Sequence, residues 1–194
     1  MKNLLDGLLK AFVGESQARN RYTFFSSIAK DEGYEQVADI FSITADNEKE
    51  HANWFYKMIK EVAEKQGANV KNLKTETGVP FTFGKTPENI QSAIEGETYE
   101  YKTMYPEIAE LAKKEGFIQI SARIRAIVEA EKHHADRYSK LISNFENGNI
   151  FVKDEPVWWM CRECGFIHFG KKAPLACPSC SHPRAFYQVL SENY

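Results

Sequence analysis

Glutamate and histidine residues recur at helical spacing in four stretches of the chain, and both side chains bind metal ions. The set consists of Glu15, Glu48, His51, Glu97, Glu100, Glu131 and His134. A spacing of three residues puts both members of a pair on one face of an α-helix. Five carboxylates and two imidazoles that converge describe a site for two metal ions, because a helical bundle would not bury so much charge without cations.

The positions of these residues argue against ordinary surface charge, although most helical glutamates are solvated. Glu48 and His51 interrupt an apolar stripe that runs from Phe41 to Phe55. Glu131 and His134 interrupt the stripe of the last helix in the same way. Four close neighbours are alternative ligands: Glu50, Glu95, Glu129 and His133. The i to i+3 geometry favours the first set.

The ligand types indicate which metals the bundle would take. Mixed carboxylate and imidazole ligands suit iron or manganese, whereas zinc prefers four ligands, commonly with thiolate or more imidazole. Carboxylates can bridge two ions and shift as the charge on the ions changes. Such a site suits redox cycling with an oxygen species.

A second metal motif lies near the C-terminus, where the four cysteines have the pattern C-x2-C-x12-C-x2-C. They are Cys161, Cys164, Cys177 and Cys180. In a reducing compartment this pattern favours a tetrahedral four-thiolate metal site over disulfides. The spacing alone leaves iron and zinc open, and a zinc ribbon is the simpler alternative.

Hydrophobic periodicity predicts four helices that position the first set, at about residues 4–30, 34–66, 86–115 and 117–146. Gly33 and Gly67 are expected to end the first two helices, and Thr86 to cap the third with Pro87 at its first position. Residues 67–86 look irregular and predict a long crossover between parallel neighbouring helices. Two hairpins joined by a crossover are ferritin-like topology, so we expect a mainly α fold.

The cysteine tail is expected to be a small separate domain, with residues 1–147 forming the bundle domain and residues 154–194 the tail domain. About forty residues do not hold a fold by core burial alone, so the metal is structurally required. An aromatic core is expected from Trp158, Trp159, Phe166, Phe169, Phe186 and Tyr187.

Composition excludes several classes of protein. The 194 residues are 43% hydrophobic and 27% charged, with a formal net charge of -2, which gives no indication of nucleic-acid binding. No apolar run approaches the roughly 20 residues that a membrane span needs. The first residues lack the features of a signal peptide, so we expect a cytoplasmic protein.

Together these segments resemble the rubrerythrin family over nearly the whole chain. The resemblance rests on residues 14–22, on the three ligand pairs, and on residues 159–183 around the cysteines. The cysteine segment departs from the pattern of free-standing rubredoxins at two points. Ser181 stands where a rubredoxin usually has glycine, and the gap between the cysteine pairs is shorter.

The resemblance implies roles for the candidate ligands. The tail would be rubredoxin-like, with one iron ion held by the four cysteines, and the bundle would hold a diiron centre. Glu48 and Glu131 would bridge the two ions, Glu15 would be terminal on one, and Glu97 and His134 on the other. His51 and Glu100 would compete for the first ion according to its redox state.

The resemblance also implies two-electron reduction of hydrogen peroxide to water. Electrons would come through the thiolate-bound iron from rubredoxin or an NAD(P)H-dependent reductase. Tyr22 and Tyr105 could reach ligand carboxylates, or could be simple core aromatics. A linker of about ten residues is expected not to fold the tail back onto its own bundle. The family therefore suggests a head-to-tail homodimer.

Two other functions stay open from the sequence. A ferritin-like ferroxidase or iron-binding protein shares the bundle but gives no reason for a thiolate redox module. A zinc-ribbon interaction module on a helical scaffold would make the tail a structural part. His182, two residues after the last cysteine, would be a surface residue or would tune the thiolate site.

Overall fold

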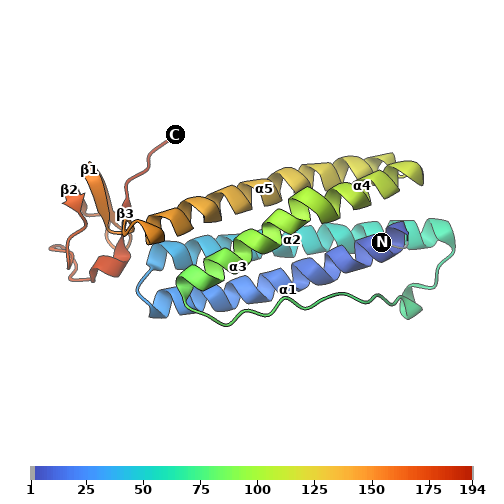
Figure 1. Cartoon of the computed structure of the whole chain (residues 1–194), viewed down its shortest axis with the longest axis horizontal. Coiled ribbons are helices and arrows are strands. Elements are labelled where there is room, and N and C mark those ends of the chain that lie inside the picture. Colours follow the sequence, from blue (N-terminus) through green and yellow to red (C-terminus); the bar gives the residue numbers. More distant parts are fainter. Residues whose placement is uncertain (1–2, 194) are drawn as a thin grey trace.

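A computed structural model describes residues 3–193 and confirms the mainly α prediction, with a ferritin-like four-helix bundle followed by a small four-cysteine domain (Figure 1). The bundle helices are α1 (Leu4–Asp31), α2 (Glu35–Gln66), α3 (Thr86–Tyr99) with its continuation α4 (Tyr105–Lys114), and α5 (Ile118–Glu146). Domain limits at residues 147 and 154 stay a prediction, and residues 1, 2 and 194 lie outside the described part.

Helix ends follow the sequence signals closely. Gly33 and Gly67 have φ of 83° and 66°, the left-handed conformation that glycine adopts without strain. The third helix begins one residue earlier than predicted, because Lys85 is the N-cap and Thr86 is already helical. The backbone N–H of Lys85 donates to the Glu88 carboxylate at 2.7 Å, which supplies the expected capping by another route.

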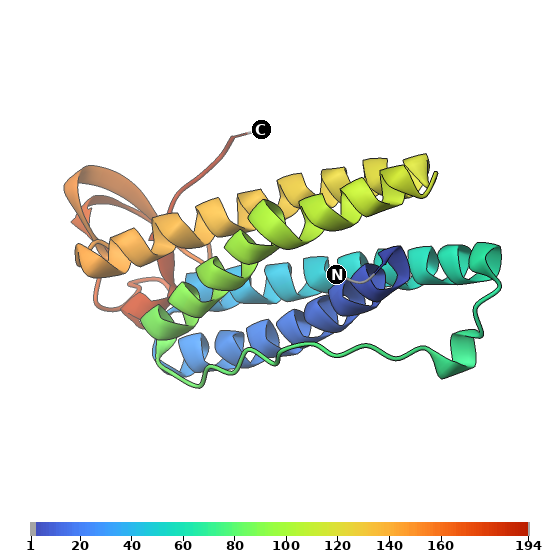
Figure 2. The same ribbon diagram turned by 45° about the vertical axis from the view of Figure 1, so that its right-hand side comes forward.

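The four helices pack as two antiparallel hairpins, α1 with α2 and α3–α4 with α5 (Figures 1 and 2). Between the hairpins, α1 packs on α3 and α4, and α2 packs on α5. The crossover therefore joins α2 and α3 as parallel helices on the diagonal of the bundle, not as the expected neighbours. This arrangement turns one face of every helix toward a common axis.

The crossover runs back along α1 over residues 67–85 and contains one short 3₁₀ turn, η1 (Val70–Asn72). The Thr75 hydroxyl donates to Asp6 at 2.9 Å. The Thr82 hydroxyl donates to Ser92 at 2.9 Å, and Asn89 exchanges two hydrogen bonds with Gly84. These side-chain contacts hold the two ends of the segment against α1 and α3.

A π-helical turn, η2 (Glu100–Met104), divides the third bundle helix, which the sequence predicts as continuous. The backbone N–H of Tyr105 donates to the carbonyl of Glu100, five residues back. Pro106 follows at once and has no N–H for a regular α-helical bond. The wider turn thus lies directly before a residue that cannot make the regular bond, and π turns of this kind are frequent at functional sites.

Two hydrophobic clusters lie at either end of the bundle and leave a polar layer between them. One includes Leu8, Phe55 and Ile124. The other is rich in aromatic rings and includes Tyr22, Phe41 and Tyr138. Because apolar cores close both ends, the four helices stay in place around whatever the middle layer contains.

The C-terminal domain is a three-stranded antiparallel sheet of order β2-β1-β3, built from β1 (Val152–Cys161), β2 (Ile167–Lys172) and β3 (Tyr187–Val189), with the turn η3 (Arg184–Phe186). Trp159 and Tyr187 are fully buried with two of the cysteines, and Phe166 and Phe186 pack against them. The expectation that Trp158 and Phe169 belong to this core is wrong. They pack on each other on the exposed face, because side chains alternate along a strand.

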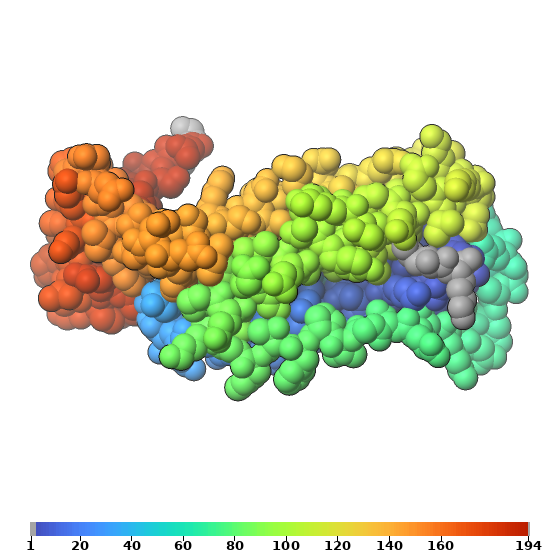
Figure 3. Space-filling model, in the orientation of Figure 1, coloured from blue at the N-terminus to red at the C-terminus, as the bar shows by residue number. Residues whose placement is uncertain are grey.

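This domain rests on the end of its own bundle, contrary to the expectation from the short linker (Figure 3). Tyr34, just before α2, stacks on Phe151 and meets Phe145 of α5 edge-on at 4.8 Å. Arg162 forms an ion pair with Asp39 of α2. These contacts hold the domain against the end of the bundle. No helix among the described residues is long and apolar enough to cross a membrane.

Candidate metal centres

The middle layer of the bundle brings six of the seven predicted ligands into two groups whose ligand atoms all lie within 4.8 Å of one another. The first group is Glu15, Glu48, His51 and Glu131. The second is Glu48, Glu97, Glu131 and His134. Glu48 and Glu131 belong to both groups, so the arrangement has two positions for an ion that share two carboxylates.

The imidazoles contact carboxylates from neighbouring helices. Nδ1 of His51 lies 2.9 Å from Oε2 of Glu48 and 2.8 Å from Oε1 of Glu131. Nδ1 of His134 lies 2.9 Å from Oε2 of Glu131, 3.2 Å from Glu48 and 3.4 Å from Glu97. Nδ1 of each histidine therefore lies next to carboxylate oxygens, so one ion could be bound by the imidazole and the carboxylates together.

Burial tests whether metal ions fit this layer. Glu15, Glu97 and Glu131 are fully buried and Glu48 is 1% exposed. Several buried atoms lack a well-aligned hydrogen bond although imidazoles lie close to the Glu131 oxygens: one oxygen each of Glu15, Glu48 and Glu97, both oxygens of Glu131 and Nδ1 of His134. Unpaired buried carboxylates are costly unless cations neutralise them. The donor set thus fits two hard cations with mixed oxygen and nitrogen ligands.

The electrostatics of this layer without cations confirm how crowded the charges are. Burial, then the charges of Glu131 and Glu48, raise the pKa of Glu15 well above its usual value. Burial alone would raise the pKa of Glu48, but hydrogen bonds from His134 and His51 lower it to about 2. Burial lowers and the carboxylates raise the pKa of His51, with a net value of about 10. The protonated imidazoles occupy the electrostatic role that cations would take.

Two tyrosines cross-link the helices through terminal carboxylates of the two groups. The Tyr22 hydroxyl of α1 donates to Glu97 of α3 at 2.6 Å, and the Tyr105 hydroxyl of α4 donates to Glu15 of α1 at 2.5 Å. Both tyrosines are buried. Tyr22 follows Glu15 by seven residues, whereas Tyr105 follows Glu97 by eight. The wide turn η2 absorbs the extra residue, so the two halves of the site match.

The seventh predicted ligand, Glu100, belongs to neither group. It begins η2 and its carboxylate lies near Gly14 of α1, so a Cβ added at Gly14 would be 3.7 Å from its Oε1. In this structure His51 is in the first group and Glu100 is outside it. The alternative ligands Glu50, Glu95, Glu129 and His133 are all exposed.

Two features of the site were missed by the sequence analysis. The π turn was missed because the apolar stripe continues through it, although Pro106 inside a helical stretch was an available signal. Arg21 was noted only as part of a resemblance. Its Nε is buried without a hydrogen-bond partner beside Glu100, and no sequence pattern marks such an arginine.

The four cysteines also converge, with all Sγ atoms within 4.8 Å of one another. The Sγ atoms of Cys161 and Cys180 are 3.8 Å apart, and those of Cys164 and Cys177 are 3.6 Å apart. A tetrahedral ion with metal–sulfur bonds of about 2.3 Å has edges of about 3.8 Å. The cysteine geometry therefore fits one tetrahedral ion.

Two similar turns supply these thiols. The residues after the second cysteine of each pair, Gly165 and Ser181, have φ of 75° and 62° and donate their N–H to the carbonyls of Cys161 and Cys177. Ser181 is the only non-glycine residue with positive φ among residues 3–193. His182 is half-buried and packs edge-on against Phe186 at 4.5 Å, so it is part of the domain and not a free surface residue.

Comparison with known proteins identifies both parts of the chain. The family model described as rubrerythrin matches residues 6–142, and the rubrerythrin rubredoxin-like domain matches residues 159–188. A putative rubrerythrin of Methanocaldococcus jannaschii is 51% identical over 195 residues, covering all of this chain and 96% of its own.

Two further relatives extend the comparison. Rubrerythrin of Clostridium perfringens is 45% identical and covers 97% of this chain and 95% of its own. A structure of nigerythrin in a fully reduced, all-ferrous state superposes with a TM-score of 0.64 at 28% identity, covering 98% of this chain and 88% of its own. The bundle with its paired carboxylate–histidine groups and the four-cysteine domain thus belong to one known architecture, and this chain is a member of the rubrerythrin family.

Proposed function

We propose that the protein is a non-haem diiron peroxidase that reduces hydrogen peroxide to water and protects against oxidative stress. The observation that carries the proposal is the presence of two metal positions sharing Glu48 and Glu131 in the same chain as a four-thiolate site. Two electrons and two protons convert one peroxide into two waters, with cleavage of the O–O bond. When bound, two ferrous ions supply both electrons together.

The ligands divide this work between them. Glu48 and Glu131 would hold both ions, while Glu15 would hold the first and Glu97 with His134 the second. Tyr22 and Tyr105 fix the orientation of the terminal carboxylates through their short hydrogen bonds. Iron rather than manganese is supported by the relatives, since nigerythrin has been solved in ferrous and mixed-valent states.

Glu100 and His51 are proposed to exchange as the centre changes its charge. Neutral imidazole is a sufficient ligand for a ferrous ion, whereas a ferric ion prefers an anionic carboxylate. His51 lies inside the first group and Glu100 outside it, and this is the ligand set that we propose for the ferrous form. Glu100 starts a π turn, whose looser backbone bonding suits a residue that moves.

The four cysteines would hold one iron ion, which accepts electrons singly and returns them to the bundle. The cysteine domain contacts its own bundle at Asp39, through Arg162. Glu48 lies nine residues further along α2, a helical rise of about 13 Å, so the cysteine site and the carboxylate layer of one chain are separated along the bundle. We propose that electrons pass instead to the bundle of a second copy in a head-to-tail homodimer. Rubredoxin or an NAD(P)H-dependent reductase would be the external donor.

Rapid mixing of the anaerobically reduced protein tests the proposal. Its visible absorption after mixing with hydrogen peroxide is compared with that after mixing with O2 at equal concentration. The peroxidase account expects much faster oxidation by peroxide. Faster oxidation by O2, or accumulation of ferric mineral, would indicate a ferroxidase or iron-binding function instead.

Electron transfer between the two copies of the proposed dimer has its own test. Two inactive variants, Glu48→Ala in the bundle and Cys161→Ser in the tail, are mixed under conditions that allow subunit exchange. Turnover with a reductase should reappear in the mixed dimer, because one copy then contributes an intact tail and the other an intact bundle. A monomer by light scattering, or no recovery in proven mixed dimers, would contradict transfer between chains.

A further inference from the structure

A cavity of about 640 Å³ lies between the crossover and the bundle, and it reaches the edge of the carboxylate layer. The crossover residues 77–82 form its outer wall. From α1 it is lined by Gly14, Gln17 and Arg21, and from the third helix by Gly96 and Glu100. Glu100 follows the ligand Glu97 by three residues and Gly14 precedes the ligand Glu15, so the inner end of the cavity lies beside the candidate metal layer.

Two glycines keep the inner end of this cavity open. Gly14 and Gly96 lie in the interior of α1 and α3, where glycine weakens a helix relative to alanine. A Cβ at Gly14 would be 3.7 Å from Oε1 of Glu100, and one at Gly96 would be 3.8 Å from Nη2 of Arg21. The missing side chains therefore leave space next to the two charged groups.

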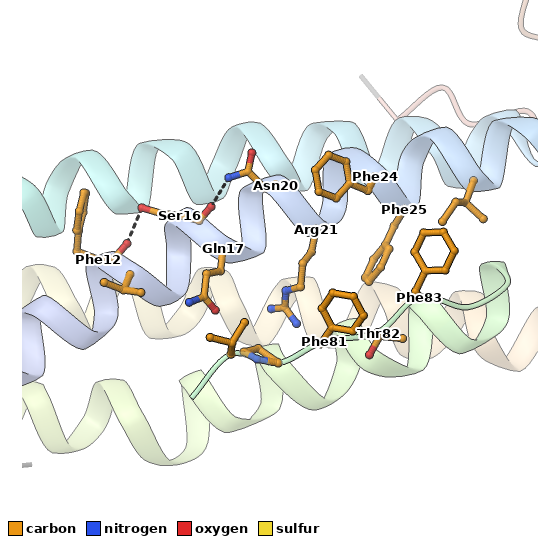
Figure 4. A pocket seen from close by; sticks show the side chains of 14 residues that line it. Phe12, Ser16, Gln17, Asn20, Arg21, Phe24, Phe25, Phe81, Thr82 and Phe83 are labelled. Carbon is orange, nitrogen blue, oxygen red and sulfur yellow. Dashed lines mark hydrogen bonds between the residues drawn. The ribbon is translucent and has the colours of Figure 1, made fainter. Parts of the chain in front are cut away.

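Arg21 is the unusual group in this space. Its Nε is buried and has no hydrogen-bond partner, and no carboxylate of the described residues lies within ion-pairing distance of its guanidinium. Figure 4, which draws the residues of a neighbouring cavity that Arg21 also lines, shows Arg21 reaching from α1 toward Phe81 of the crossover. A second, apolar cavity of about 420 Å³ lies on the other side of Arg21. The buried Nε–H of Arg21 is therefore available to donate a hydrogen bond to an oxygen ligand.

We infer that the cavity between the crossover and α1 and α3 is where hydrogen peroxide reaches and is held beside the bundle centre, with Arg21 donating a hydrogen bond to it. Hydrogen peroxide is small and neutral, and each oxygen both donates and accepts. Arg21 offers donors and Glu100 offers carboxylate oxygens at the same end of the cavity. This inference rests on the proposed peroxidase function and names a binding site for its substrate.

Arg21→Gln tests the hydrogen bond, with Arg21→Lys as the conservative variant. Arg19→Gln is the matched control, because Arg19 is exposed two residues away on the same helix. Each fully iron-loaded, reduced protein is mixed with hydrogen peroxide and, separately, with O2. We expect Arg21→Gln to slow the peroxide reaction roughly tenfold, with partial recovery in Arg21→Lys, and to leave the O2 reaction unchanged, because O2 is a poor acceptor.

The outcomes separate this inference from the proposed function. Slow oxidation of the wild type by peroxide would reject the peroxidase itself. Rapid oxidation of both wild type and Arg21→Gln would leave the peroxidase standing and overturn the role of Arg21. An equal loss with peroxide and O2 would also overturn it, because Arg21 would then act on the centre and not on the substrate.

Gly96→Ala tests the cavity independently if Arg21→Gln fails to fold or to bind iron. Alanine favours the helix, and its methyl group would narrow the space beside Arg21 without a clash. The ratio of the rate with tert-butyl hydroperoxide to the rate with hydrogen peroxide should fall severalfold, while the thermal midpoint is unchanged or higher. An unchanged ratio would show that substrate reaches the centre by another route.

Discussion

The bundle site and the cysteine site bind metal in opposite structural settings. The bundle ligands come from four helices that two apolar clusters hold in place, and the metals would fill a layer of buried charge. The cysteine ligands come from two short turns, and two of them are among the five buried residues that form the core of their domain. One fold prepares a site for its ions, whereas the other fold depends on its ion.

The contrast also explains which site can change its ligands. Glu100 and His51 project from separate helices of the bundle, so the proposed exchange needs local movement and not refolding. Backbone N–H groups of the same turns donate to Cys161, Cys177 and Cys180. Burial raises the pKa of Cys177, but the N–H groups of Cys180 and Ser179 and the Tyr187 hydroxyl lower it to about 6. A fixed thiolate shell suits one-electron transfer with little rearrangement, and a mobile carboxylate shell suits chemistry on a substrate.

The largest expected effect is on folding of the cysteine domain. Cys177→Ser should abolish metal binding there and unfold residues 152–189, because the small core includes two of the ligands and such a domain depends on its metal. The bundle should remain helical. Amide hydrogen exchange checks both statements: protection should vanish in β1 and persist in α5. Retained protection in β1 would mean that the aromatic residues alone hold the domain.

Loss of metal in the bundle is the next largest effect, and it should depend on which carboxylate is removed. Glu48→Ala should lose both bundle ions, because Glu48 is shared, whereas Glu15→Ala should lose one. Metal analysis per chain distinguishes the two, with the exposed Glu50→Ala as control. The cysteine-bound ion should remain in all three. Equal losses in both variants would contradict the sharing of Glu48.

The stability of the metal-free bundle should fall between about pH 5 and about pH 8. Burial and the charge of Glu48 raise the pKa of Glu97 to about 8, so the stability that its protonated form contributes is lost as the pH rises through that value. His51 and His134, whose pKa values are raised to about 10 and about 12, also lose stabilising protons as the pH rises.

The metal-loaded bundle should respond in the opposite direction over the same range. Metal binding needs deprotonated ligands, so its affinity rises with pH and adds stability to the loaded form. Thermal midpoints of both forms, measured at several pH values, check the two slopes. Parallel curves for the two forms would mean that protonation of these residues is not linked to metal binding.

The smallest effect is expected from the tyrosine hydroxyls. Tyr105→Phe removes the hydrogen bond to Glu15 and should weaken iron binding in the bundle by roughly tenfold, the usual scale for a group that orients a ligand. The spectrum of the cysteine site should not change. A competition titration with a chelator measures the difference, and the exposed Tyr56→Phe serves as control. An unchanged affinity would make Tyr105 a core aromatic only.

The sequence predicts most of the bundle from its apolar stripes, and it predicts most of the site from the polar residues that interrupt those stripes. Glu48 and His51 were identifiable for that reason, and the cysteine spacing predicted the second site directly. The sequence did not reveal where Glu100 lies, because its place depends on the π turn and on the approach of α1 at Gly14. It also misplaced Trp158, since two adjacent tryptophans in a strand cannot face the same side.

The central claim is that the cysteine-bound iron delivers electrons to peroxide through the bundle centre. Reduced wild type and reduced Glu48→Ala, both with iron in the cysteine site, are mixed anaerobically with hydrogen peroxide while the ferric thiolate absorption is followed. The account predicts rapid appearance of this absorption in the wild type and a much slower one in Glu48→Ala. Equal rates in both proteins would mean that peroxide oxidises the thiolate iron directly, and would contradict the account.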